Sequence, residues 1–388
     1  MKSDVATIQL SQPRKVSYAE YALLAVVLLV ATKFCTLPAV LTGIAGSKAV
    51  WVVFILLGIE MLSLFFATKT AKCGGLAALP LRAGIRIPLL LFFAFFFALK
   101  LTAFAREIST YYALSLFENA PVLPIMIIHL IACALLAKKG YMGVGRVTEV
   151  FVWLFAFVFL FVVIFTRTEG DLFNALSIFN PDVKGMGQGI GKGMAWFGDS
   201  VAISFLDLSG EERFSPHAQG VPIPKKRRNA KRKILFAAVT CSFLLVVLFF
   251  AVFISSYGEA AKMTDYAFIK LSTFKANTDE LGSADWPVII LWAIISSLYL
   301  ALLFLSGKEC ITGIVPSLDQ KKKNMIPFFL LGGAAVVIST LLLDEEGDYE
   351  SFMTRFLNVI TFLSVAGSIA VGIYSLIKAK GEKDEKAQ

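Results

Sequence analysis

The sequence is poor in charge and in histidine, and it lacks paired cysteines. Charged residues make up 17% of its 388 positions, whereas soluble domains carry roughly 25%. Its two histidines, His129 and His217, lie far apart, and its five cysteines form no CxxC pair. These absences argue against a soluble fold, a zinc site and a disulfide framework. Since there is also no nucleophile–base pair, metal cluster or nucleotide motif, we expect no cofactor, no metal and no enzymatic activity.

Apolar residues are abundant. They make up 57% of the chain, which includes 35 phenylalanines and has a mean hydropathy of +0.75. A helix that spans a bilayer needs roughly 20 apolar residues, so this composition would fill roughly ten spans. The sequence therefore predicts an all-α polytopic membrane protein. The predicted spans are residues 17–45, 49–70, 87–116, 122–137, 144–166, 189–208, 234–255, 286–306, 325–343 and 351–377.

The distribution of positive charge predicts the orientation of these spans. Of the 37 lysines and arginines, 26 fall in the alternate loops that share a side with the N-terminus, and only eight fall on the other side. Because cytoplasmic loops are enriched in Lys and Arg, both tails, 1–16 and 378–388, should be cytoplasmic. The run KKRRNAKRK at 225–233 is then a topology anchor that contacts anionic membrane lipid, and we expect no nucleic-acid partner. The opposite loop, 256–285, contains amphipathic stretches around 259–272 that predict short helices over the mouth of the bundle.

Two spans carry signals for an interrupted helix. Transporter folds built from two inverted repeats place their binding site at broken helices near the membrane midplane. If 1–388 is a single transmembrane domain with repeats at about 17–166 and 189–377, spans 1 and 6 are equivalent. Span 1 contains Pro38, and span 6 contains Gly198 next to Asp199. A simple kink at Pro38 is the alternative. The candidate ligand-binding residues are Cys35, Thr36, Leu37, Pro38, Phe197, Gly198, Asp199 and Ser200.

Charged residues inside the spans are a second signal, because an unpaired charge in a membrane is costly. The predicted intramembrane charge network consists of Lys33, Glu60, Lys100, Glu107 and Asp199. These residues either line a cavity or ion pathway, or only hold the helices together. Lys33 in particular could pair with Asp199 or Glu60, or face lipid and reach the headgroups.

Polar residues in spans 3 and 8 are candidates for lining a cavity. Lys100, Phe104, Glu107 and Tyr111 are spaced 4, 3 and 4 residues apart, so they share one face of span 3. In span 8 the polar residues are Ser296, Ser297 and Tyr299. Serine is also common where membrane helices pack, so packing alone is the alternative for span 8.

Three short motifs, in this order and spacing, carry a family resemblance. They are Thr36-Leu37-Pro38 in span 1, Lys139-Gly140 leading to GRVTE at 145–149, and LSIFNP at 176–181 followed by Phe197-Gly198-Asp199. With these motifs the chain resembles the B subunit of nutrient germinant receptors of spore-forming bacteria, within the amino acid–polyamine–organocation transporter superfamily. It differs from that family at Lys33, where a glycine-bearing stretch is usual, at Asp199, where Glu is more common, and at Asp207-Leu208-Ser209, where a proline often closes span 6.

The resemblance implies a fold and a set of partners. The fold would be the ten-helix, five-plus-five inverted-repeat transporter (LeuT-type) fold with helices 1 and 6 interrupted. The protein would bind a small nutrient, an amino acid or a similar molecule, and would act with receptor A and C subunits in the spore inner membrane. An amino acid permease of the same superfamily is the alternative function.

The predicted breaks also suggest how such a ligand would lie. A half-helix that begins at Pro38 turns its free N–H groups and positive dipole toward the midplane, so a ligand carboxylate should lie beside Thr36 and Leu37. The ligand's amino group would then meet span 6 carbonyls and Asp199. Transporters of this fold often hold sodium between helices 1 and 8, and the Lys33 ammonium could replace that ion with a fixed charge.

The predicted topology can be tested by cysteine labelling. In a variant whose five native cysteines have been replaced, a cysteine at position 227 should be protected from a membrane-impermeant reagent in sealed cells. A cysteine within 256–285 should react with it. Labelling of position 227 from outside would contradict the predicted orientation.

Overall fold

The structure is a computed structural model, and it describes residues 18–117, 120–167, 172–179, 183–208, 225–273, 285–319, 324–343 and 346–385. All regular secondary structure in these ranges is helical. Six of the described helices are each long and apolar enough to cross a membrane. Large apolar side chains such as Ile128, Trp153 and Phe362 are exposed on the outside of the bundle, which is the surface expected to face lipid. The chain is therefore a multi-pass membrane protein.

The first half of the chain begins with an interrupted helix. Helices α1 and α2 are separated by the non-helical residues 31–36, and the short helix η1 turns the chain back into the long helix α3. The remaining helices of this half follow with short connections. The elements are α1 (Tyr18–Val30), α2 (Leu37–Ala45), η1 (Gly46–Lys48), α3 (Ala49–Lys72), η2 (Leu76–Ala78), α4 (Ala83–Ser115), α5 (Val122–Ala137) and α6 (Gly140–Arg167).

The second half also contains an interrupted helix. This broken helix is formed by α8, η3 and η4, and a π-helical turn, η7, precedes the last helix. The basic run 225–233 belongs to α9, so that helix extends nine residues further toward the N-terminus than predicted span 7. The elements are α7 (Leu172–Ser177), α8 (Met186–Gly193), η3 (Met194–Trp196), η4 (Asp199–Phe205), α9 (Lys225–Tyr257), η5 (Gly258–Met263), α10 (Ala267–Thr273), α11 (Asp285–Ile314), η6 (Pro316–Asp319), α12 (Ile326–Leu342), α13 (Glu346–Ser351), η7 (Phe352–Leu357) and α14 (Asn358–Glu385).

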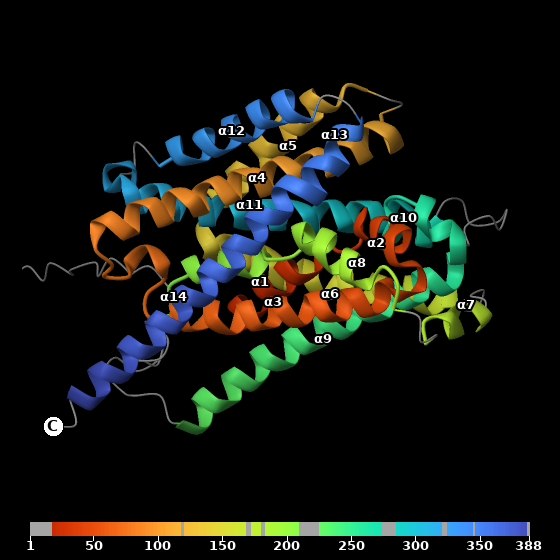
Figure 1. Ribbon diagram of the computed structural model, residues 1–388. Helices are drawn as coiled ribbons and strands as arrows, with labels where there is room; N and C mark the ends of the chain where they lie inside the picture. The colour runs from red at the N-terminus through yellow and green to blue at the C-terminus, as the bar shows by residue number, and fades with distance from the viewer. Residues whose placement is uncertain are drawn as a thin grey trace, which may run out of the picture.

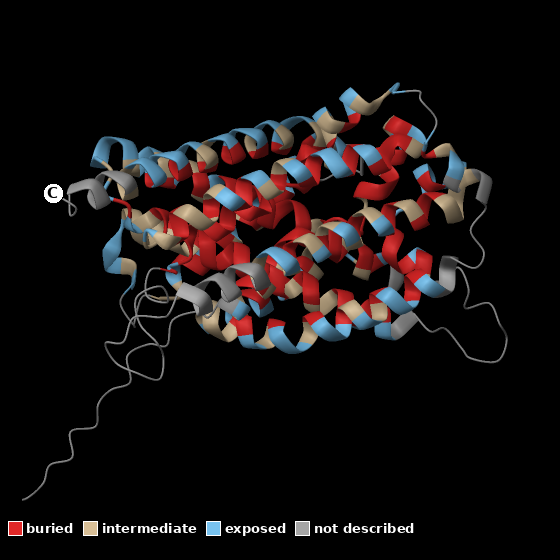
Figure 2. Cartoon of the chain, turned by 90° about the horizontal axis from the view of Figure 1, so that it is seen from below, coloured by how far each residue is buried: buried red, intermediate tan, exposed pale blue. Residues whose placement is uncertain are grey.

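The two broken helices lie inside the bundle. Helix α4 packs along α11, α1 packs against α9, and α3 packs against both η4 and α14. In Figure 1, α12 and α5 lie on one side of the bundle, α9 lies on the other, and α14 crosses it obliquely. Figure 2 shows that buried residues fill the interior while exposed residues follow the outer helix faces. The interrupted segments are consequently enclosed by long helices, which places their non-helical backbone away from lipid.

A segment between α9 and α11 covers the break between α1 and α2. As the amphipathic pattern predicts, residues 259–272 contain short helices, η5 and α10. The amide of Ala267 donates to the Cys35 carbonyl at 3.1 Å, and the amide of Phe268 donates to the Phe34 carbonyl at 3.0 Å. The Phe34 ring packs between Phe159 and Phe249, at centroid distances of 5.0 and 4.5 Å. Two backbone hydrogen bonds and an aromatic cluster therefore attach α10 to the non-helical segment.

Candidate ligand-binding site

The break in the first helix follows from its proline. Helix α1 ends at Val30, and α2 begins at Leu37 with Pro38 in its first turn. Proline suits this position because the first N–H groups of a helix have no intrahelical acceptor. The sequence predicted an interruption here, and the interruption is confirmed.

The break in the second half of the chain is formed by two residues. Phe197 is extended, with φ −116° and ψ −171°, and Gly198 is left-handed, with φ +77°. The two breaks face each other, because the Thr32 hydroxyl lies 3.2 Å from the Trp196 carbonyl and 3.3 Å from Asp199 Oδ2. The predicted interruption of span 6 is confirmed as well.

Four of the five predicted network residues form one buried cluster around the breaks. Lys33 Nζ lies 2.6 Å from Asp199 Oδ2 and 3.6 Å from Glu60 Oε2. Lys100 Nζ lies 2.9 Å from Asp199 Oδ1, and the side chains of all four residues are 0% exposed. Since Lys33 is fully enclosed, it does not face lipid. Two lysines and two carboxylates give this cluster no net charge.

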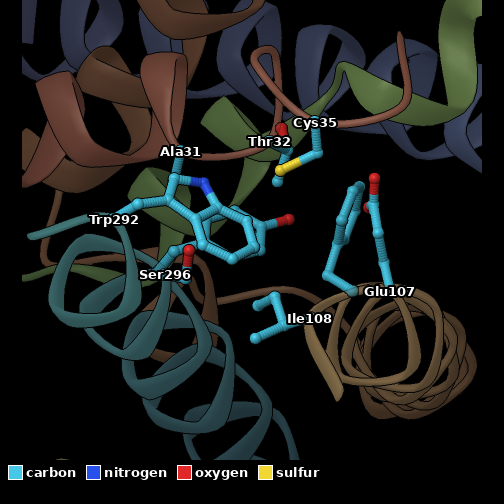
Figure 3. Close-up of a pocket in the computed structure, with 9 residues that line it drawn as sticks. Ala31, Thr32, Cys35, Glu107, Ile108, Trp292 and Ser296 are labelled. Atoms are coloured by element: carbon cyan, nitrogen blue, oxygen red, sulfur yellow. The ribbon is translucent and has the colours of Figure 1, made fainter. Parts of the chain in front are cut away.

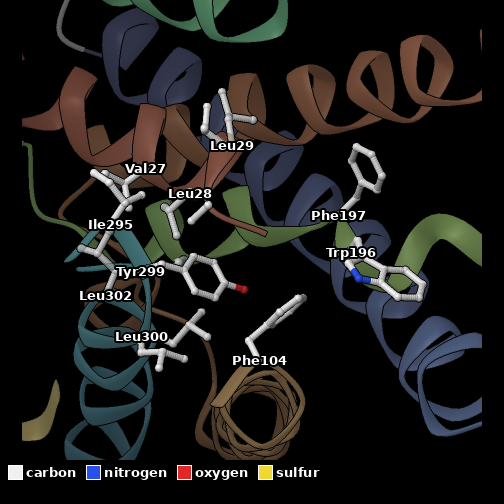
Figure 4. Packing of buried hydrophobic residues seen from close by; sticks show 14 of the residues in the cluster. Val27, Leu28, Leu29, Phe104, Trp196, Phe197, Ile295, Tyr299, Leu300 and Leu302 are labelled. Carbon is white, nitrogen blue, oxygen red and sulfur yellow. The ribbon is translucent and has the colours of Figure 1, made fainter. Parts of the chain in front are cut away.

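Neutral donors complete the cluster. The Tyr299 hydroxyl donates to Asp199 Oδ1 at 2.8 Å, and the amide of Ser200 donates to Glu60 Oε1 at 2.9 Å. Lys100 also donates to the carbonyls of Ala195 and Phe197, both at 2.7 Å. The ammonium of Lys100 thus binds carbonyl oxygens that the broken helix leaves without backbone partners. Figure 4 shows the apolar residues around this region, among them Leu28, Phe104, Trp196 and Phe197.

The fifth network residue, Glu107, lies apart at the start of α2. Its Oε1 atom accepts hydrogen bonds from the Thr36 amide at 3.1 Å and from the Thr36 hydroxyl at 2.5 Å. A carboxylate is favoured at this end of a helix because the free N–H groups and the dipole are positive there. Glu107 therefore takes the position that the sequence assigned to a ligand carboxylate.

The predicted ligand pose does not fit this structure. The Glu107 carboxyl group lies beside Thr36, where the ligand carboxylate was expected. The Lys100 ammonium binds the Phe197 carbonyl and Asp199, where the ligand's amino group was expected. Both residues lie on one face of α4, seven positions apart. The protein's own acid and base therefore fill the two polar positions of the predicted pocket.

A small cavity lies beside Glu107, between the first break, α4 and α11. Its volume is about 10 Å³, which is room for roughly one water molecule. Figure 3 shows Glu107 from α4 and Trp292 and Ser296 from α11 around this space. The lining residues are Ala31, Thr32 and Cys35 of the break, Phe104, Glu107 and Ile108 of α4, and Trp292, Ser296 and Tyr299 of α11.

The remaining predicted residues have other surroundings. Tyr111 does not line the cavity, and its ring packs against Trp292 and Tyr266 at 5.4 and 4.9 Å. Ser297 is directed elsewhere, since its hydroxyl lies 3.0 Å from His129 Nε2. Leu37, Pro38 and Ser200 are buried near the breaks.

Sequence reasoning missed four lining residues, namely the apolar Ala31 and Ile108 and the hydrogen-bonding Thr32 and Trp292. Thr32 is directly before Lys33, within the predicted break. Trp292, Ser296 and Tyr299 are spaced 4 and 3 residues apart, so a search for one face of span 8 would have joined Trp292 to the two polar residues.

We expect the neutrality of the charge cluster to control stability. Lys33→Met leaves Glu60 and Asp199 with only one ammonium, and breaking a buried pair in this way costs about 3–5 kcal/mol. Adding Glu60→Gln restores neutrality, so Lys33→Met/Glu60→Gln should recover much of the loss. Unfolding in detergent micelles measures both variants. Lys262→Met, which removes the exposed pair with Glu259, is the control and should change little. A double variant no more stable than Lys33→Met would contradict the charge-balance explanation.

A second prediction concerns Gly198. Its φ of +77° disfavours any side chain, and an added Cβ would lie 2.6 Å from Thr361 Cγ2 and 3.0 Å from Val365 Cγ2. Gly198→Ala should therefore lower the free energy of unfolding by at least about 1 kcal/mol. Gly187→Ala is the matched control, because a Cβ there meets nothing within 4 Å. Equal thermal stability of the two variants would refute the close approach to α14.

Comparison with known proteins identifies the fold of this chain and no family. No protein-family model matches the sequence, and no curated protein matches it. A solved Na⁺-coupled sialic acid symporter in a substrate-bound outward-open state superposes with a TM-score of 0.54 at 11% identity, covering 90% of this chain and 78% of the symporter. A mutant form of the Eremococcus coleocola manganese transporter gives a TM-score of 0.55 at 14% identity, covering 96% and 90% of the two chains. The same transporter in complex with an aromatic bis-isothiourea compound gives 0.51 at 13% identity, with the same coverage. At these identities the likeness shows the fold alone, and that fold is the predicted LeuT-type transporter fold.

Proposed function

We propose that this chain binds a small organic solute between the α1–α2 break, α4 and α11, as a membrane protein of the transporter class. The cavity there has room for roughly one water molecule, so binding widens it and favours a more open conformation. One observation carries the proposal. Two broken helices meet in the bundle interior, and beside them Trp292 Nε1 and Ser296 Oγ are buried without a hydrogen-bond partner among the described residues. Non-helical backbone at membrane depth is tolerated where it lines a binding cavity.

The narrower role that we propose is the nutrient-binding subunit of a germinant receptor, with A and C subunits as partners in the spore inner membrane. The motifs around Pro38, Glu149 and Asp199 support this role. An amino acid permease is the alternative. The neighbours of known structure are named for sialic acid and manganese transport, so their cargoes differ too widely to select a ligand for this chain.

One feature of the site favours a sensor over a fast carrier. Asp199, on the second broken helix, is bonded to Lys33 of the first break, to Lys100 of α4 and to Tyr299 of α11. Alternating access moves one group of helices against another. Such a movement would have to separate these buried charged contacts in every cycle, whereas a receptor needs only a shift between two conformations.

The purified chain in sealed liposomes tests both functions. Equilibrium binding and net uptake of labelled L-alanine should be measured on the same preparation. A receptor should bind without uptake above protein-free liposomes, whereas concentrative uptake would establish the permease. Ser296→Phe places a ring in the cavity and should abolish binding in either case. Binding that survives Ser296→Phe would contradict the assigned cavity.

The same assay should show no requirement for sodium. Lys33 and Lys100 direct their ammonium groups at the carbonyls of Leu28, Ala195 and Phe197, at 3.5, 2.7 and 2.7 Å. These oxygens would otherwise be available to a bound alkali cation. Replacing sodium with potassium should therefore leave the dissociation constant unchanged. A strict sodium requirement would refute the fixed-charge interpretation of the two lysines.

A further inference from the structure

Glu107 is a buried acid without a buried base. Its exposed fraction is 3%, and it makes no ion pair with any residue in the described ranges. The four other buried charges of the predicted network neutralise one another around Asp199. The titratable groups that interact electrostatically with Glu107 are Cys35, Asp265, Tyr266, Tyr299 and Tyr349. Since none of these is cationic, the described residues supply no counter-ion for the Glu107 carboxylate, so its negative charge is favoured when a cation binds beside it.

The geometry of Glu107 leaves acceptor capacity for another partner. Both Thr36 donors are directed at Oε1. These two bonds use only Oε1, and the Tyr349 hydroxyl also faces the carboxyl group. With about four lone-pair sites in all, the carboxylate can still accept from a further donor. Because Glu107 also lines the cavity, its carboxyl group is positioned to bind a cation that enters there.

The opposite wall offers neutral donors. Trp292 and Ser296 are 1% and 2% exposed. Within the described part of the chain no partner lies at hydrogen-bond distance from Trp292 Nε1 or Ser296 Oγ, and the polar group that faces Trp292 is the weakly accepting Cys35 thiol. A buried donor left unpaired costs about 1–3 kcal/mol, so these two groups favour a ligand that brings an acceptor. The aromatic rings of Phe104 on α4 and Tyr299 on α11 also line the cavity, and they favour a cation over an anion.

We propose that the ligand is a small organic cation in which a protonated amine lies against Glu107 and a neutral oxygen accepts from Trp292 and Ser296. An amino alcohol of a few carbons has this pattern. An amino acid can take the same pose, but its carboxylate would then face only neutral donors. This pose places the amine near the start of α2, opposite to the orientation predicted from the sequence. The assignment rests on the proposed function, because it names the ligand class of the same cavity.

Three compounds with one carbon skeleton test the assignment. L-Alaninol, L-alanine and L-lactate share a three-carbon chain and differ in their charged groups. With the full chain in nanodiscs, labelled L-alaninol should bind most tightly, L-alanine more weakly, and L-lactate not at all. Glu107→Gln keeps the carbonyl that accepts from Thr36 and removes only the charge. This variant should weaken L-alaninol binding by at least about tenfold.

Adjacent serines on α11 provide the matched control. Ser296→Ala removes a cavity hydroxyl and should weaken L-alaninol binding, whereas Ser297→Ala removes the hydroxyl beside His129 and should not. Preference for L-lactate, or equal L-alaninol binding by the wild type and Glu107→Gln, would overturn the amine assignment and leave the cavity intact as a site. Absence of binding for all three compounds would overturn the assignment too. Binding of another solute that Ser296→Phe abolishes would still support the proposed function in that event.

Discussion

Asp199 is the residue on which the interior of this protein depends. Its carboxylate accepts from Lys33, Lys100 and Tyr299 at 2.6, 2.9 and 2.8 Å, so that the first break, α4 and α11 all meet the second break at one side chain. A broken helix inside a membrane exposes carbonyl and amide groups that lipid cannot satisfy. Here Lys100 and Thr32 bind the carbonyls around Trp196, and Asp199 holds both of these side chains in position. Without that carboxylate, two ammonium groups would lie together in an apolar interior with only Glu60 to neutralise them.

The buried charges satisfy the backbone groups of the two breaks, but burying them has an electrostatic cost of its own. Burying four charges is expensive even when they are paired, and an apolar cluster of similar volume is often more stable. The charges hold the two breaks in a fixed position relative to each other, because each ammonium group donates hydrogen bonds to carbonyls and to carboxylates at the same time. Lys33 and Lys100 thereby donate hydrogen bonds to oxygen atoms that would otherwise suit a metal cation. The positive charges of this site are therefore lysine ammonium groups of the chain, in the place of a bound metal ion.

The sequence predicts the local features of this fold, such as the helix breaks, but not the tertiary contacts between distant helices. Pro38 and Gly198 act on their own backbone, so the positions of both breaks follow from residue chemistry alone. The pairing of Lys33 with Asp199 or Glu60 could be anticipated because buried charges require partners. The position of Glu107 at Thr36 could not, because it depends on the rotation of α4 and on its distance from the break. Trp292 could have been placed on the face of Ser296 and Tyr299 by its spacing, but the surroundings of its N–H are apparent only once the neighbouring helices are placed.

Helix α4 presents two charged residues on one face, and they stand in opposite situations. Lys100 has every donor engaged with Asp199 or a carbonyl, so it belongs to the frame that holds the breaks together. Glu107 is bonded through Oε1 to the first turn of α2, and the segment before that turn carries α10 through the carbonyls of Phe34 and Cys35. A cation at Glu107 would share its carboxylate with Thr36 and so alter a charge-assisted contact that ties α4 to α2. The cavity is thus connected to α10 by hydrogen bonds through the first break, and to the cluster around Asp199 through Thr32 and Tyr299, which line the cavity.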